Sequence, residues 1–245
     1  MTTKSGFPKE ACAFITGASK GIGRAIAFRL AEAGVRVALG ARSQDQIEEA
    51  ASEIQTEGGQ SLAVPLDVTN PNSVSTAVQR VERKWGPIDI LVNNAGIALF
   101  DDILSSKTSD WLRMYEVNVL GALRLTQAVL PSMLKWNEGR IVMIASTASH
   151  KAYPSQAGYC ASKGALLAFS RVLLEELKGT GVRVHVVSPG GVDTELARST
   201  RDASVANEYM EPREVANTVL FLLQSHSLGT VDEIILRRHQ ASPML

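Results

Sequence analysis

Short apolar runs alternate with longer amphipathic stretches along almost the whole chain of 245 residues. Most of the runs are rich in β-branched residues and nearly continuous in apolar character, which is typical of strands buried on both faces of a parallel sheet. The expected strands cover residues 11–16, 35–40, 61–66, 88–93, 139–146, 182–188 and 231–236. Apolar spacing near 3.6 residues predicts helices over residues 21–33, 43–57, 72–85, 108–135, 157–179 and 212–223.

This alternation predicts an α/β fold: a single-domain, Rossmann-type, doubly wound parallel sheet of about seven strands, with helices on both faces. No repeat, low-complexity tract or linker divides the sequence, so residues 1–245 are expected to form one domain. The stretch 191–211 has little apolar periodicity and follows the sixth expected strand. Because loops after strand ends border the ligand crevice in such folds, we interpret 191–211 as a substrate-side loop, with an ordinary surface connection as the alternative.

Composition narrows the classes of partner. Lys plus Arg and Asp plus Glu both total 25, so no basic excess favours nucleic acid or an anionic membrane surface. No run of 18 apolar residues predicts a membrane span, and the first residues lack the apolar segment of a signal peptide. Cys12 and Cys160 are expected to be free thiols, which favours a cytoplasmic location. The histidines and cysteines show no metal-ligand spacing, so no metal site is expected.

A glycine-rich turn joins the first expected strand to the first expected helix. Residues 14–25 read FITGASKGIGRA, with Gly17, Gly21 and Gly23 in the turn. Glycines allow a tight turn and a close approach of the backbone to a phosphate, and the helix N-terminus behind them offers free N–H groups and a positive dipole end. A glycine-rich turn alone is weak evidence, but its position between strand and helix predicts a dinucleotide pyrophosphate site.

The glycine spacing here is G-x-x-x-G-x-G. Together with NNAG at 93–96 and Y-x-x-x-K at 159–163, the TGxxxGIG motif at 16–23 resembles the short-chain dehydrogenase/reductase family, in its branch of roughly 250 residues. The resemblance extends over about residues 11–195. It implies an oxidoreductase that transfers a hydride between a nicotinamide cofactor and a small-molecule carbonyl or alcohol substrate, in one dinucleotide-binding and catalytic domain.

The cofactor-binding residues follow from the matched motifs and their neighbours. By resemblance, Asp67 contacts the adenine amino group with Val68 packed beside it, and the PGGVDT segment at 189–194 lies near the nicotinamide carboxamide. Asn93 and Asp89 are expected to be structural. The complete predicted set is Gly17, Ser19, Lys20, Gly21, Ile22, Gly23, Arg42, Asp67, Val68, Asn94, Ala95, Gly96, Tyr159, Lys163, Pro189, Gly190, Val192 and Thr194.

The end of the second expected strand predicts which cofactor is preferred. It reads VALGARSQD, with Ala41 where an aspartate would bind the ribose 2′-hydroxyl of NAD. Arg42 follows, and Lys20 lies in the glycine turn, so two cations can converge on a 2′-phosphate. We therefore predict NADP(H) in preference to NAD(H); the alternative is that both are ordinary solvated charges.

Four polar residues match the family's catalytic tetrad without substitution. Asn118 lies within a long expected helix, Ser146 ends the fifth strand, and Tyr159 and Lys163 open the next helix. A carbonyl that accepts a hydride needs a proton, and Tyr159 can supply it as the general acid/base. A free phenol has a pKa of about 10, which a neighbouring ammonium lowers toward the working pH. Ser146 can donate to the substrate oxygen.

The resemblance also implies that Lys163 binds the nicotinamide ribose, and that Asn118 holds a water linking Lys163 to solvent. His150 and Tyr153 follow Ser146 and either border the substrate or lie in an exposed loop.

Two alternative functions remain open. One is a 3-oxoacyl-carrier-protein reductase, although the tail LGTVDEIILRRHQASPML lacks the glycine pair that such relatives carry. The other is a non-catalytic NADP(H)-binding sensor or regulatory module, which should lose the tyrosine or the lysine.

The resemblance further implies a homodimer or homotetramer that pairs through the helices at 108–135 and 157–179. Apolar positions of the second helix fit either that contact or packing on the sheet: Ala165, Leu166, Ala168, Phe169, Val172 and Leu173.

Overall fold

The computed structural model describes residues 10–200, 209–224 and 229–243, and places seven parallel strands in one sheet of order β3-β2-β1-β4-β5-β6-β7. The single-domain Rossmann-type prediction is confirmed. Because all neighbouring strands run parallel, their C-terminal ends meet along one edge of the sheet. The strands are β1 (Cys12–Thr16), β2 (Arg36–Ala41), β3 (Ser61–Pro65), β4 (Ile90–Asn93), β5 (Gly139–Ile144), β6 (Val182–Pro189) and β7 (Glu233–Leu236).

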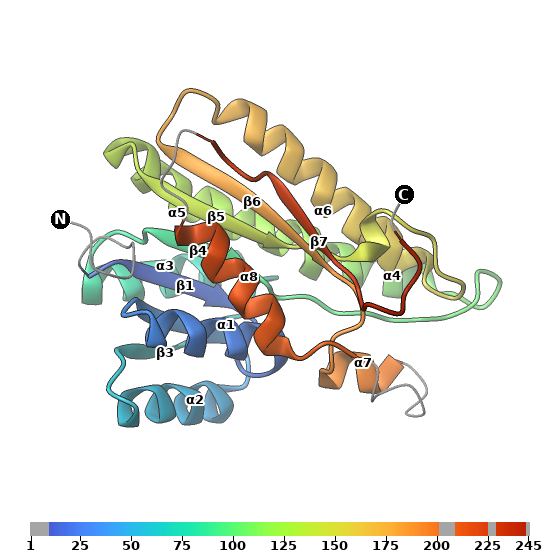
Figure 1. The fold of residues 1–245 in the computed structure, drawn as a ribbon, viewed down its shortest axis with the longest axis horizontal. Helices are drawn as coiled ribbons and strands as arrows, with labels where there is room; N and C mark the ends of the chain where they lie inside the picture. Colours follow the sequence, from blue (N-terminus) through green and yellow to red (C-terminus); the bar gives the residue numbers. More distant parts are fainter. Residues whose placement is uncertain (1–9, 201–208, 225–228, 244–245) are drawn as a thin grey trace.

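Helices cover both faces of the sheet, as Figure 1 shows. One hydrophobic core joins the sheet to α1 (Gly21–Glu32), α2 (Gln44–Thr56) and α8 (Pro212–Gln224); the other joins it to α3 (Pro71–Trp85), α5 (Gly121–Trp136) and α6 (Ala157–Glu176). Alternate residues of β1 serve the two cores, with Ile15 in the first and Phe14 in the second. Burial on both faces explains why the strands read as continuous apolar runs.

The expected helix at 108–135 is not one regular α-helix. It consists of α4 (Thr108–Tyr115), a π-helical turn η1 (Glu116–Leu120) and α5. Asn118 lies in the π-helical turn. Such turns interrupt regular helices at functional positions more often than elsewhere. Apolar periodicity cannot reveal one, because the inserted residue changes the hydrogen-bond pattern without breaking the amphipathic pattern.

Two further short elements were not expected from periodicity. A single 3₁₀ turn, η2 (Thr147–Ser149), follows Ser146, and the six-residue helix α7 (Glu195–Thr200) lies inside the predicted loop 191–211. The two ends of that loop are held together by a bridge between Val192 and Met210. Part of the predicted loop, residues 201–208, lies outside the described residues.

One helical segment of the described residues, Thr108–Trp136, has the length and composition of a membrane span. The sequence analysis expected no membrane span, and by length and composition this segment is an exception. Within the protein, however, 39% of its most apolar window is buried. Leu125, Val129 and Met133 pack into the core beneath the sheet. We therefore interpret the segment as a core helix.

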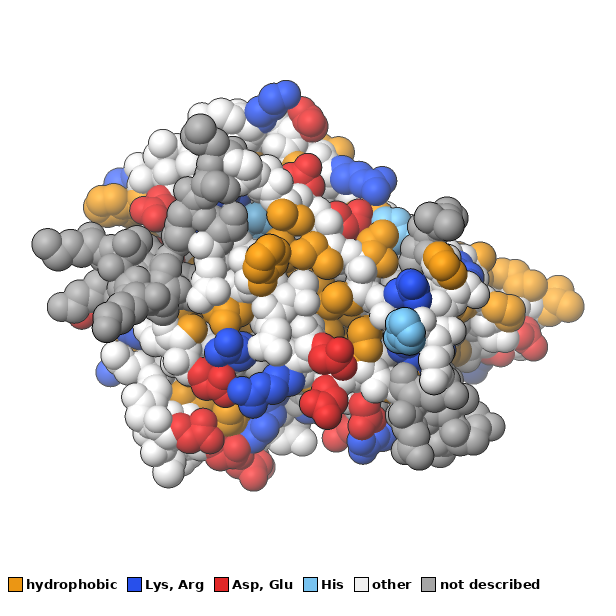
Figure 2. Space-filling model, viewed as in Figure 1, with side chains coloured by type: hydrophobic (Ala, Val, Ile, Leu, Met, Phe, Trp, Pro, Cys, Tyr) orange, Lys and Arg blue, Asp and Glu red, His pale blue; other side chains and the backbone are white. Residues whose placement is uncertain are grey.

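On the face drawn in Figure 2, Lys and Arg side chains are interspersed with Asp and Glu.

Candidate active site

A cleft of about 550 Å³ runs along the C-terminal edge of the sheet. Ligand sites typically occupy 300–1,000 Å³, so the cleft has the size of a ligand-binding site. Every cofactor-binding and catalytic residue predicted from the sequence lines it, except Gly23 and Asn118. Residues from far apart in the chain meet there because parallel strands present their C-terminal ends at one edge.

The glycine turn forms one end of the cleft. Gly17 has a φ of 65°, and a Cβ on it would lie 2.9 Å from the Cα of Ala95. A Cβ on Gly23 would lie 2.4 Å from the carbonyl oxygen of Gly17, so Gly23 shapes the turn without lining the cleft. The N-terminus of α1 beyond the turn has no side-chain cap and no acidic residue in its first turn. Its N–H groups and positive dipole end therefore remain suited to an anion.

Thr16 and Asn94 hold this turn against the end of β4. The Thr16 hydroxyl donates to the carbonyl of Val92 and accepts from the backbone N–H groups of Asn94 and Ala95. The Asn94 amide donates to the carbonyls of Thr16 at 2.9 Å and Gly17 at 3.2 Å. Asn94 thus braces the turn with its side chain, while Asn93 donates to Thr126 and Met143 within the core.

The charged residues beside the turn differ in their surroundings. Arg42 is exposed at the rim of the cleft, next to the buried Ala41. Lys20 instead forms an ion pair with Glu195, the first residue of α7. Glu195 also lines the cleft. The sequence predicted only the cations Lys20 and Arg42 for this part of the cleft, whereas the structure adds a carboxylate.

Asp67 lies after β3 in the same half of the cleft. One of its carboxylate oxygens accepts from the backbone N–H and the hydroxyl of Thr69, which lowers the pKa of Asp67. The other oxygen accepts no hydrogen bond from the described residues, so it remains available to a donor in the cleft. The cap of the following helix α3 is Asn70, so Asp67 is not needed to cap that helix.

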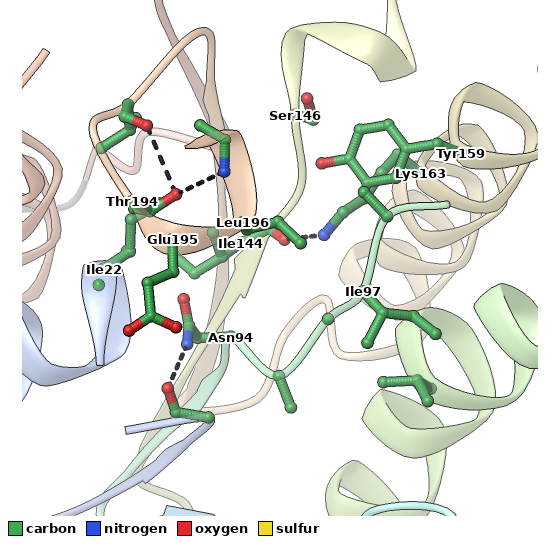
Figure 3. Close-up of a pocket in the computed structure, with 18 of the residues that line it drawn as sticks. Ile22, Asn94, Ile97, Ile144, Ser146, Tyr159, Lys163, Thr194, Glu195 and Leu196 are labelled. Atoms are coloured by element: carbon green, nitrogen blue, oxygen red, sulfur yellow. Dashed lines mark hydrogen bonds between the residues drawn. The ribbon is translucent and has the colours of Figure 1, made fainter. Parts of the chain in front are cut away.

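Ser146 and Tyr159 meet in the other half of the cleft. Figure 3 shows the Tyr159 hydroxyl, carried by α6, directed toward Ser146, which lies in the turn after β5. Ser146 is 8% exposed, and its Oγ accepts from the N–H of Ala148, which leaves its own proton for another acceptor. The ring of Phe100 packs edge-on against Tyr159 at 5.7 Å between centroids. A carbonyl oxygen in this space would meet two hydroxyl donors.

Lys163 lies one turn of α6 beyond Tyr159. Its Nζ donates to the carbonyl of Ile144 at 2.8 Å, and the residue is only 5% exposed. Burial lowers the pKa of Lys163 from 10.5 to about 8, because an ammonium loses hydration in the interior. A Cβ on Gly96 would lie 3.6 Å from this Nζ, so the glycine of NNAG leaves room beside the ammonium.

Asn118 acts on the backbone beside the cleft. Its Oδ1 accepts from the N–H of Ile97 at 2.8 Å, and its Nδ2 donates to the Ile97 carbonyl at 2.9 Å and to the Ser162 hydroxyl at 3.0 Å. Both amide protons are therefore used by protein groups. The side chain clamps the segment that follows NNAG, and the water that the resemblance assigns to Asn118 stays a prediction.

The segment after β6 closes over the glycine turn. Thr194 caps α7 by accepting from the N–H of Ala197 at 3.2 Å, and its methyl group would lie 3.1 Å from a Cβ on Gly21. Figure 3 shows Thr194 and Glu195 beside Ile22, facing Lys163 and Tyr159 across the cleft. This contact positions the predicted PGGVDT segment directly against the predicted phosphate turn.

Several lining residues were not identified from the sequence: Phe100, Arg113, Gln156, Glu195 and Leu196. None belongs to a motif, and only the folded chain brings them to the cleft. The sequence left open whether His150 and Tyr153 border the substrate. Tyr153 lines the cleft, and its hydroxyl lies 3.1 Å from that of Thr147. His150 does not line it and pairs with Glu233 of β7 at 2.6 Å. No group of three or more His, Cys, Asp or Glu within the described ranges could hold a metal ion.

Comparison with known proteins identifies the family. A model of the family described as short chain dehydrogenase matches residues 11–204. An uncharacterized oxidoreductase of Staphylococcus saprophyticus is 37% identical over 230 residues, which cover 94% of this chain and 97% of that protein. A 3-oxoacyl-[acyl-carrier-protein] reductase of Escherichia coli is 35% identical over 231 residues, covering 91% and 93%.

Among solved structures, an alcohol dehydrogenase from the archaeon Thermococcus sibiricus, complexed with 5-hydroxy-NADP, is similar with a TM-score of 0.88. It is 34% identical in sequence, and the match covers 96% of this chain and 99% of that one.

Proposed function

The chain belongs to the short-chain dehydrogenase family, and we propose that it interconverts a ketone or aldehyde with the corresponding alcohol, using NADP(H) in preference to NAD(H). One observation carries the proposal: the Tyr159 hydroxyl is directed toward Ser146, and the buried Lys163 lies one helical turn from Tyr159. A carbonyl oxygen placed there would receive a proton and a second hydrogen bond during reduction.

The residues of the cleft fit a dinucleotide cofactor. Gly17 and Gly23 form a cradle that any Cβ would obstruct, and the uncapped N-terminus of α1 faces it. Arg42 at the rim suits a 2′-phosphate, and Ala41 offers no carboxylate to a 2′-hydroxyl. Asp67 keeps one carboxylate oxygen for an amino group. When bound, NADP(H) supplies or accepts the hydride.

We assign distinct roles to the four residues of the tetrad. Tyr159 gives a proton to the substrate oxygen in reduction and takes it back in oxidation. Ser146 steadies the same oxygen by donating its hydroxyl proton, since its lone pairs already accept from Ala148. Lys163 favours negative charge on the phenol oxygen while it is itself protonated. Asn118 fixes the backbone at Ile97, which borders the cleft, and so acts as a positioning residue.

A substrate panel with a matched pair of variants tests this proposal. Ketones, aldehydes, alcohols and 3-oxoacyl thioesters would be followed by nicotinamide absorbance with the parent enzyme, Tyr159→Phe and Tyr115→Phe. Tyr115 lies outside the cleft and donates only a 3.4 Å hydrogen bond to Ala161, so its variant serves as the control. Tyr159→Phe should bind NADPH like the parent and lose at least about a hundredfold in kcat. Unimpaired turnover by this variant would remove Tyr159 from the acid/base role.

Two alternatives are separated by the same panel. The relationship to a 3-oxoacyl-[acyl-carrier-protein] reductase favours 3-oxoacyl thioesters as a second candidate class. A kcat/KM that is much higher for thioesters than for simple ketones would support it. Tight NADPH binding without turnover of any substrate would instead support the non-catalytic sensor or regulatory module.

We also propose self-association through α4, α5 and α6. The structure divides the apolar residues named for α6: Leu166 and Leu173 are buried in the core, whereas Val172 is 57% exposed. Trp136 and Leu112 on the neighbouring helices are 65% and 66% exposed. Sedimentation of the parent and of Val172→Glu tests the proposal, since a buried charge at a helix pair should dissociate the oligomer. Identical sedimentation would place the interface elsewhere.

A further inference from the structure

Gln156 is a buried polar residue in the cleft that the catalytic tetrad does not use. It lines the cleft immediately before α6 and is only 8% exposed. Its side chain makes no capping hydrogen bond at the helix N-terminus. Its Oε1 is buried without a partner, and its Nε2 makes no hydrogen bond with the described residues. A buried carbonyl oxygen without a partner costs roughly 1–3 kcal/mol, and such groups in native structures call for an explanation.

The backbone that carries Gln156 is held in an unfavourable conformation. Ser155, the residue before it, has a φ of 59°, in the left-handed region. This conformation costs a residue with a side chain roughly 1–2 kcal/mol. Two contacts with the loop after β4 maintain it: the Ser155 carbonyl accepts from the N–H of Asp101, and its hydroxyl donates to Asp102. The fold therefore fixes the position of Gln156 as well as burying it, which is expected of a residue with a binding role.

The position of Gln156 relative to Tyr159 defines what its amide can reach. Gln156 is the N-cap residue of α6 and stands three positions before Tyr159, so both side chains belong to the N-terminal end of the same helix, and both line the cleft. A substrate whose carbonyl oxygen contacts the Tyr159 hydroxyl would extend along the cleft, where the amide of Gln156 can meet atoms close to the reacting carbon. Nε2 can donate to an oxygen, and Oε1 can accept from a hydroxyl after rotation of the amide. Phe100 and Leu196 also line the cleft, and their side chains offer only apolar contact.

We propose that Gln156 is a specificity-determining residue, which hydrogen-bonds a second oxygen on the α or β carbon of the carbonyl substrate. The preferred substrates are then hydroxy ketones, dicarbonyl compounds or 3-oxo esters with an apolar remainder, and simple ketones are poorer substrates. This inference rests on the proposed oxidoreductase function and extends it to a substrate class.

The test compares matched substrates with the parent enzyme and Gln156→Leu. Diacetyl and hydroxyacetone are each paired with butanone, and an acetoacetate ester is paired with a levulinate ester, whose second oxygen is farther away. For each substrate pair, the ratio of the two kcat/KM values is compared between the two enzymes. This comparison removes the contribution of the substrates' intrinsic reactivity, which is the same for both enzymes. The ratio should fall about tenfold in Gln156→Leu, the factor expected for one lost hydrogen bond. Gln79→Leu on the exposed face of α3 is the matched control.

A second readout separates recognition from a structural role. The thermal midpoint of Gln156→Leu should equal or exceed that of the parent, because an apolar group of similar size replaces an amide whose buried oxygen has no partner. A lower midpoint with unchanged kcat/KM ratios would make Gln156 structural and overturn the inference. Unchanged ratios at any midpoint would also overturn it. If the parent turned over no substrate of the panel, the proposed function itself would fail, and this inference with it.

Discussion

Replacing Lys163 by methionine should make the protein without cofactor more stable while destroying its activity. The ammonium of Lys163 is almost completely buried, and its one hydrogen bond with the described residues goes to the carbonyl of Ile144. No carboxylate contributes to the shift of its pKa, which burial alone lowers. An uncompensated buried charge is destabilising, and sites that bind ligands commonly retain such a cost for the sake of function.

The pKa gives the size of the effect. A decrease from 10.5 to about 8 is roughly 2.5 units, which corresponds to about 3 kcal/mol at pH 7, where the folded and unfolded chains both carry the proton. Methionine has a similar length but removes the hydrogen bond to Ile144, which costs about 1 kcal/mol. The net gain is about 2 kcal/mol, which for a chain of this size raises the thermal midpoint by roughly 4–8 °C.

The assay is thermal unfolding of Lys163→Met and the parent, without cofactor, between pH 7 and pH 10. Because the folded pKa of Lys163 lies below the unfolded value, the folded parent releases the proton first as the pH rises. The unfolded chain then binds more protons, so the stability of the parent should increase between pH 8 and about 10.5. The advantage of the variant should therefore shrink with pH. Lys178→Met, at a lysine with a 79% exposed side chain, should show no such trend.

Two results would refute this reasoning. A variant that melts below the parent at pH 7 would mean that the ammonium is stabilised in the folded protein. A difference in thermal midpoint that stays constant up to pH 10 would mean that the pKa of Lys163 is not lowered.

Three further predictions concern the cofactor half of the cleft. Arg42→Ala should raise the Kd for NADPH about tenfold or more and leave that for NADH nearly unchanged, because only NADPH has a 2′-phosphate; titration by fluorescence checks this, and equal losses for both cofactors would contradict the assignment. Glu195→Gln should lower the Kd for NADPH by up to about fivefold, because Lys20 loses an exposed ion pair that competes with the cofactor. A higher Kd would contradict this and show that the Lys20–Glu195 ion pair helps to hold α7 beside the glycine turn. Gly23→Ala should lower both the thermal midpoint and the affinity for NADPH, because the added methyl group would lie 2.4 Å from the Gly17 carbonyl oxygen. The control is Gly164→Ala, which should retain the parent's thermal midpoint because its methyl group would meet no atom within 4 Å.

Local patterns in the sequence determined the fold and the outline of the site. Strand and helix periodicity depends on neighbours two to four residues apart, so the seven strands and the main helices follow from it within a few residues. The motif glycines identify the turn for the same reason: Gly17 needs a left-handed backbone and Gly23 a close backbone contact, and both requirements can be recognised from spacing. Tyr159 and Lys163 are one helical turn apart, so their proximity is also a local property.

Only the tertiary structure decided how the polar groups of the cleft are shared. Asn118 clamps Ile97 across 21 residues, and Lys20 pairs with Glu195 across 175, and neither contact leaves a periodic signal. The Oε1 of Gln156 is buried without a partner only because of how the folded chain encloses it. The pKa of Lys163 likewise depends on burial, which is a property of everything packed around the side chain. The sequence determined which residues come to the cleft, and packing determined which of them remain free to act there, because hydrogen bonds and desolvation depend on neighbours that are distant in the chain.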